Sequence, residues 1–172
     1  MKKLIVVVAV LLFSSAVAGI VTIQFRGKSR PVDTLEKGST LLLESGEFAW
    51  GLGVQSIVQG NKITFYLGRK AKITVDATLG KNDWLYVEPY AVAKALGYTV
   101  KLEKKDGKNP TDVLTVNYPS KIACADFATY EDANKFYRAS SNLIGQSFED
   151  RDPYNLDRGK DGSACDELPK AG

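Results

Sequence analysis

Acidic residues gather near the carboxyl end of the chain, in the segment LDRGKDGSACDEL at residues 156–168. Ca²⁺ takes six to eight oxygen ligands from a loop that turns sharply. Gly162 stands directly after an aspartate, where a residue without a side chain allows that turn. The segment therefore predicts a Ca²⁺-binding loop. Its candidate oxygen donors are Asp157, Asp161, Asp166 and Glu167.

The match to a full EF-hand loop is incomplete. If Asp157 is position 1, then Gly159 stands where a second carboxylate belongs, and Leu168 stands where the bidentate glutamate belongs. Asp166 and Glu167 could close a shortened loop instead. The alternative is an acidic, glycine-containing surface turn, because such turns are common and most bind no metal.

Two cysteines, Cys124 and Cys165, are the only ones in the chain, and the second lies inside the acidic loop. A bond between them would close a loop of about 40 residues and stabilise the fold by about 4 kcal/mol in the chain-entropy model. Residues 121–169 are too few to build a large core. We therefore expect a disulfide in this region.

The segments CADFATYEDANKFYRAS and DPYNLDRGKDGSACDEL resemble the Excalibur family of extracellular calcium-binding domains over roughly residues 122–168. The matching positions are Cys124 with Asp126 and Phe127, then Asp152, Pro153 and Tyr154, then the loop at residues 157–166. Two positions differ from the family pattern: Gly159 replaces the middle aspartate, and Asp166 replaces a glutamate. The resemblance implies a Ca²⁺ site with a Kd of roughly 10⁻⁴ to 10⁻³ M, as in weak extracellular modules.

The amino terminus has the pattern of a secretory signal peptide. Lys2 and Lys3 precede an apolar run at residues 4–13 and the small-residue triplet Ala-Val-Ala at residues 16–18. The alternative, a transmembrane anchor, needs about 20 apolar residues, and this run has about half of that. We expect cleavage after Ala18 and a secreted protein, in the periplasm or at the cell surface of a bacterium, where disulfides persist.

Charge and composition exclude several classes of function. Without residues 1–18 the chain keeps 21 basic and 20 acidic residues, a net charge of +1. We therefore expect no nucleic-acid partner and no membrane span in the mature chain. The chain has no histidine, so catalytic triads, Cys-His nucleophiles and His-ligated zinc or copper cannot form. No pair of acids stands out for glycoside hydrolysis, and a noncatalytic protein is expected.

Residues 19–118 show short strands and one helix. Residues 54–59 and 62–67 are joined by Gly60 and Asn61, which predicts a tight hairpin of two strands. Apolar and polar residues alternate in residues 62–67, and residues 71–75 repeat this period of two. Further strands are expected at residues 21–26, 40–43, 98–103 and 113–117, and the segment GKSRPVDTLEKG between the first two could be a loop. Pro89 and Gly97 bound a predicted helix. The pattern indicates an α+β fold with a small antiparallel sheet packed on one helix.

The segment WLYVEPYAVAKALGYTVKLE at residues 84–103 resembles the core of the copper amine oxidase N-terminal-like domain. That family is a noncatalytic module of bacterial secreted and cell-wall proteins. The resemblance implies a strand, a helix that begins at a proline and ends in Leu-Gly-Tyr, and a following strand. It implies no copper, because the chain has no histidine to bind it.

A second domain is expected at residues 122–170, stapled by the disulfide and built from one helix and the EF-hand-like loop. Thr129 and Asp132 resemble a capping pair, and the following helix would bury Ala133, Phe136 and Tyr137. The leading hypothesis is a secreted, noncatalytic Ca²⁺-binding protein with an N-terminal interaction module. The alternative keeps this fold without the metal, as an adaptor for a cell-wall or extracellular protein partner.

Overall fold

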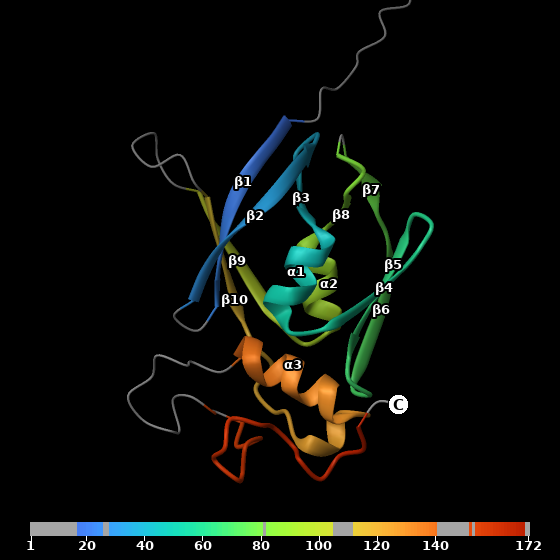
Figure 1. Ribbon diagram of the computed structural model, residues 1–172. Helices are drawn as coiled ribbons and strands as arrows, with labels where there is room; N and C mark the ends of the chain where they lie inside the picture. Colours follow the sequence, from blue (N-terminus) through green and yellow to red (C-terminus); the bar gives the residue numbers. More distant parts are fainter. Residues whose placement is uncertain are drawn as a thin grey trace, which may run out of the picture.

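A computed structural model describes residues 17–25, 28–80, 82–104, 112–140, 152 and 154–170. The described residues form strands and helices whose arrangement Figure 1 shows. The strands are β1 (Val17–Phe25), β2 (Lys28–Lys37), β3 (Thr40–Glu44), β4 (Gln55–Gln59), β5 (Lys62–Leu67), β6 (Ala71–Asp76), β7 (Thr78–Leu79), β8 (Leu85–Val87), β9 (Thr99–Glu103) and β10 (Asp112–Asn117). The helices are α1 (Ser45–Leu52), α2 (Pro89–Ala95), the 3-10 helix η1 (Cys124–Asp126) and α3 (Tyr130–Ser140).

Two sheets enclose a pair of helices. One sheet has seven strands in the order β7-β8-β3-β2-β1-β10-β9, and the other has three in the order β4-β5-β6. All pairs are antiparallel except β1 with β10, which is parallel. Helices α1 and α2 lie between the sheets (Figure 1) and contact both of them. The predicted α+β class is confirmed, and the structure adds a second sheet and helix α1 to the expected single sheet and helix.

Helix α1 was not predicted, because its boundaries lack the usual sequence signals. Its N-cap is Glu44, whose side chain accepts hydrogen bonds from the backbone N–H groups of Gly46 and Glu47 at 2.8 and 2.6 Å. Serine, threonine, aspartate or asparagine is the usual residue at this position. Glycines within the helix further weaken the sequence signal. Gly53 ends the helix at φ +66°, where a residue without a Cβ is favoured.

Strand β2 forms in the segment that could have been a loop. Its register with β1 runs from residue 28 to residue 36, while its register with β3 begins only at Thr34. Pro31 therefore lies in the part of β2 that has no partner on the β3 side. There the missing N–H of proline costs no hydrogen bond of the sheet.

The predicted hairpin and the predicted helix between Pro89 and Gly97 are confirmed. The pairing of β4 with β5 runs from Gln55 opposite Tyr66 to Gln59 opposite Lys62, across the turn at Gly60 and Asn61. Side chains at alternate positions of β5 are at most 1% exposed, as the period of two predicts: Ile63, Phe65 and Leu67. Gly97 follows α2 at φ +82°.

Helix α3 packs directly against the end of α1. A Cβ added at Gly53 would lie 2.6 Å from the Cβ of Ala139, so only glycine permits this approach. The hydroxyl of Tyr118 donates to the carbonyl oxygens of Gly51 at 2.6 Å and Ala139 at 3.2 Å, linking the two helices. One hydrophobic cluster runs through the molecule and includes Leu52 from the first predicted domain and Phe136 from the second. The boundary between the two predicted domains stays a prediction.

The signal-peptide prediction falls mostly outside the described residues. Residues 1–16 are not described, and the last two residues of the predicted peptide, Val17 and Ala18, pair in β1 with Glu36 and Leu35. Residues 105–111, between the strands predicted at residues 98–103 and 113–117, also lie outside the described residues. Among the residues that are described, no helix is long and apolar enough to cross a membrane.

Candidate metal centre

Cys124 and Cys165 form the predicted disulfide, with their Cα atoms 5.5 Å apart. The bond joins η1, which follows β10 in the sequence, to the acidic loop near the carboxyl end. Beside it, the backbone N–H of Cys165 donates to the carbonyl oxygen of Leu156 at 2.9 Å. Residues 156 and 165 therefore meet at the base of a loop, and the acidic residues from Asp157 onward lie within it or just after it.

Asp157 organises this loop from inside. Asp157 is only 1% exposed. Its two carboxylate oxygens accept hydrogen bonds from three groups. Oδ1 accepts the backbone N–H of Asp161 at 3.2 Å, and Oδ2 accepts the backbone N–H of Gly162 at 2.9 Å and the hydroxyl of Tyr137 at 3.4 Å. Such bonds offset the cost of burying a carboxylate. Gly162 is the predicted turn residue, at φ +92°.

Asp152 holds the backbone of Asp157 in place through a hydrogen bond. It is 4% exposed, and its Oδ2 accepts the backbone N–H of Asp157 at 2.7 Å. Among the described residues its other oxygen, Oδ1, is buried without a hydrogen-bond partner. A buried carboxylate oxygen normally has a donor or a cation beside it. Asp152 matches the Excalibur motif but was not among the predicted oxygen donors.

Asn134, which was not among the predicted site residues, joins the loop to α3. Its Oδ1 accepts the backbone N–H of Ala164 at 3.1 Å, and its Nδ2 donates to the carbonyl oxygen of Ala164 at 3.2 Å. Nδ2 also donates to the carbonyl oxygen of Tyr130 at 3.1 Å. The available signal was the residue type, since asparagine inside a helix has low propensity and needs another reason to be there.

Two of the predicted donors flank the missing ligand position. A Cβ built at Gly159 would lie 3.8 Å from Oδ2 of Asp161 and 3.8 Å from Oδ2 of Asp166. The backbone of Gly159 is not in the left-handed region, so a side chain fits there without strain. Asp161 is exposed, and its Oδ1 accepts the backbone N–H of Ser163 at 2.9 Å. The space in front of Gly159 is thus bordered by carboxylates.

The pKa of Asp166 shows that the loop carboxylates act on one another. The loop removes part of the hydration of the Asp166 carboxyl, and the negative charges of Asp161, Asp157 and Glu167 repel its charged form. Together these effects raise the pKa of Asp166 above its ordinary value, while Lys170 lowers it. Glu167 is exposed and belongs to this charge cluster. The other three predicted donors therefore each repel the negative charge of Asp166.

The cluster does not form a complete metal-binding group. Within the described part of the chain, no set of three or more aspartate, glutamate, cysteine or histidine side chains is placed to hold a metal ion. The physical reason lies at Gly159, because the position between Asp161 and Asp166 lacks a carboxylate. These residues offer a cation the carboxylates of Asp161 and Asp166, a preorganised Asp157, and Oδ1 of Asp152, which lacks a hydrogen-bond partner within the described part of the chain.

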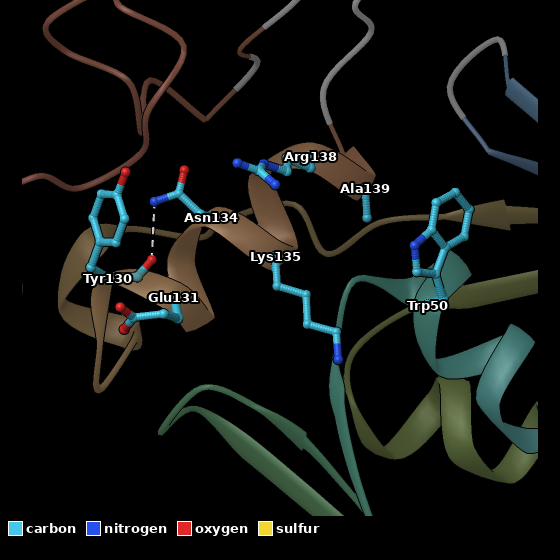
Figure 2. A pocket seen from close by; sticks show the side chains of 7 residues that line it. All are labelled: Trp50, Tyr130, Glu131, Asn134, Lys135, Arg138 and Ala139. Carbon is cyan, nitrogen blue, oxygen red and sulfur yellow. Dashed lines mark hydrogen bonds between the residues drawn. The ribbon is translucent and has the colours of Figure 1, made fainter. Parts of the chain in front are cut away.

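A pocket of about 400 Å³ lies along α3 and is lined by side chains of α3 and by Trp50 of α1 (Figure 2). Arg138 and Lys135 point in different directions there, and Asn134 turns toward Tyr130, to which it donates (Figure 2). Burial lowers the pKa of Lys135, although Asp132 opposes this effect. The lining mixes aromatic rings with both signs of charge: Trp50, Tyr130, Glu131, Asn134, Lys135, Arg138 and Ala139.

Comparison with protein-family models, with curated proteins and with solved structures finds no match to this chain. The resemblances to the Excalibur family and to the copper amine oxidase N-terminal-like domain therefore stay predictions from the sequence motifs.

Proposed function

We propose that this is a secreted, noncatalytic protein whose loop at residues 157–167 binds Ca²⁺ weakly. The observation that carries the proposal is the arrangement around Gly159, where the carboxylates of Asp161 and Asp166 border one space beside the preorganised Asp157. Ca²⁺ is bound by carboxylate and carbonyl oxygens and needs no histidine. This matches a chain that has none.

The electrostatics of the loop favour a cation. Without one, lost hydration and then the charges of Asp161, Asp157 and Glu167 raise the pKa of Asp166, so its ionisation is less favourable. A bound divalent cation would turn this mutual repulsion into attraction toward a common centre. Oδ1 of Asp152, which has no hydrogen-bond partner among the described residues, is a second feature beside this loop that suits a nearby positive charge.

The framework of the loop suits weak and reversible binding. The disulfide, the Asn134 contacts with Ala164 and the hydrogen bonds to Asp157 fix the backbone before any ion arrives. A backbone that is already fixed loses less conformational entropy when the ion binds. The affinity is limited by the ligand missing at Gly159, so a Kd of roughly 10⁻⁴ to 10⁻³ M is expected, a range that suits an extracellular site.

The test is thermal unfolding of the chain without residues 1–18, in EDTA and in Ca²⁺ at about ten times its Kd. Ligand linkage predicts a stability gain of about 1.4 kcal/mol at that concentration. Asp161→Asn should reduce the gain, whereas the matched control Asp76→Asn, an exposed acid on β6, should keep it. Equal melting temperatures with and without Ca²⁺ would refute the proposal.

The alternative function is a metal-free adaptor for a cell-envelope or protein partner. One observation favours it: Asp157 already receives three hydrogen bonds from the protein, so the loop closes without an ion. The pocket beside α3 would then be the natural contact surface, because aromatic and charged groups line it together. On this alternative, reduction of the disulfide loosens residues 122–170, and chelation changes nothing.

A further inference from the structure

In the part of the chain that the structure describes, the two sheets have four edge strands, and these differ in how they are protected from pairing with another chain. Strand β7 has only two residues, β9 carries Lys101 and Glu103, and β6 carries Lys72 and Asp76. Short length and charge are the usual protections of an edge. Strand β4 has neither, because its sequence QSIVQ has no charge and no proline, and all five residues are exposed.

The free edge of β4 offers backbone groups in a definite pattern. In a hairpin with a two-residue turn, the residues that flank the turn exchange backbone hydrogen bonds, and bonded pairs then alternate with unbonded pairs. Here Gln59 and Lys62 flank the turn, so Gln59, Ile57 and Gln55 bond to β5. Ser56 and Val58 therefore direct their N–H and C=O groups outward, away from β5.

This pattern is self-complementary about Ile57. If two copies of β4 pair antiparallel with Ile57 opposite Ile57, then Ser56 of each copy lies opposite Val58 of the other. Both of these residues direct their backbone groups outward, so two bonded pairs form. The ends also match, since Gln55 meets Gln59 without opposed charges. The apolar side chains at the centre, Ile57 and Val58, are 48% and 54% exposed in the single chain.

We propose that β4 is a self-association site, at which two copies of this chain pair edge to edge around a twofold axis at Ile57 and join their three-stranded sheets into one of six strands. Such an interface is isologous and closes at two copies. Helix α3 bounds the site at its first residue, because α3 covers the preceding Gly53 and its Asp132 accepts a hydrogen bond from the side chain of Gln55. An interface this short falls below the roughly 1,200 Å² of stable complexes, so the dimer is weak and forms at high concentration.

Cysteine crosslinking tests the register directly. Opposed residues of an unbonded antiparallel pair have Cα atoms about 4.5 Å apart, which is within the range a disulfide can bridge. Ile57→Cys should therefore crosslink to its own copy under mild oxidation. Val58→Cys is the matched control, because it is about equally exposed but lies two positions out of register with itself, beyond the roughly 7 Å limit. Peptide mapping must show the native disulfide intact in both variants.

Sedimentation velocity over a concentration series supplies the second readout. The weight-average sedimentation coefficient of the unmodified chain should rise with concentration. Ile57→Lys should abolish that rise, while Thr74→Lys, which adds the same charge on β6, should preserve it. A constant coefficient in the unmodified chain, or crosslinking of Val58→Cys as fast as Ile57→Cys, would overturn the proposal. Because β4 lies outside the acidic loop, the result should be the same in Ca²⁺ and in EDTA, and it stands apart from the calcium test.

Discussion

Asn134 pairs with the backbone of Ala164 through both ends of its side-chain amide, accepting the N–H at 3.1 Å and donating to the C=O at 3.2 Å. Both residues are buried, at 6% and 0% exposure. A side-chain amide that binds a peptide group in this way reproduces the pairing of two strands. Asn134 therefore ties the acidic loop to α3 through both groups of one peptide unit, beside the contact of Tyr137 with Asp157.

Replacement of Asn134 by alanine should destabilise the protein by at least about 2 kcal/mol. The change leaves the buried N–H and C=O of Ala164 without partners, and each unsatisfied group costs about 1–3 kcal/mol. Urea unfolding monitored by circular dichroism measures the loss. Lys94→Ala, at an exposed position of α2, should change the free energy of unfolding by less than about 0.5 kcal/mol. Similar values for the two variants would contradict the assigned role of Asn134.

An aspartate at Gly159 should strengthen Ca²⁺ binding. The new carboxylate would enter the space bordered by Asp161 and Asp166, where a Cβ meets only contacts of 3.8 Å. Added ligand charge tightens calcium loops, and a gain of about tenfold in affinity is expected. Isothermal titration calorimetry compares Gly159→Asp with Gly159→Ala, which adds the Cβ without the charge. If the two variants bind equally, the space at Gly159 is not a ligand position.

Asp166→Asn should raise the stability of the calcium-free protein and lower the stability gain from Ca²⁺. The first effect follows because the folded state raises the pKa of Asp166, through lost hydration and the charges of Asp161, Asp157 and Glu167. The folded protein therefore holds a proton at this carboxyl more tightly than the unfolded chain does. Stability consequently falls as the pH rises from the unfolded pKa through the folded pKa, and the full penalty is present above both.

Melting temperatures in EDTA across the acid range check this sign. The contribution of Asp166, taken as the difference between the unmodified chain and Asp166→Asn, should become more unfavourable as the pH rises through that window. A contribution that becomes more favourable with rising pH would show that Asp166 is stabilised, not repelled, by its neighbours.

Removal of the disulfide should cost about 4 kcal/mol of unfolding free energy in the chain-entropy model. The double change Cys124→Ser with Cys165→Ser avoids a free thiol, since both cysteines are in the bond. In this variant, the backbone amides of residues 154–170 should exchange their hydrogens faster than those of β5, which lies in the three-stranded sheet away from the disulfide. If the loop amides stay as protected as those of β5, the hydrogen bonds alone hold the loop.

Local patterns predicted much of the fold. The period of two in β5, the turn at Gly60, the helix after Pro89 and the capping contact from Thr129 to the N–H of Asp132 at 3.2 Å are all set by neighbours in sequence. Helix α1 and the parallel pairing of β1 with β10 were not foreseen, because they depend on contacts between distant segments.

The same division holds at the site. The disulfide followed from residue type and spacing and is confirmed, and Gly162, the predicted turn residue, has a φ of +92°. The roles of Asn134 and Asp152 depend on how α3 and the preceding segment pack on the loop, which no local pattern specifies. Sequence reasoning identified Gly159 as a missing ligand, and the structure shows which carboxylates border the resulting space.

The most direct test of the central claim is a Ca²⁺ titration followed by the backbone amide signals of Asp161 and Gly162, the two groups that donate to Asp157. We predict saturable shifts of these signals with a Kd of roughly 10⁻⁴ to 10⁻³ M, and no saturable shift in Asp157→Asn. Amide signals that stay in place throughout the millimolar range would contradict calcium binding by this loop.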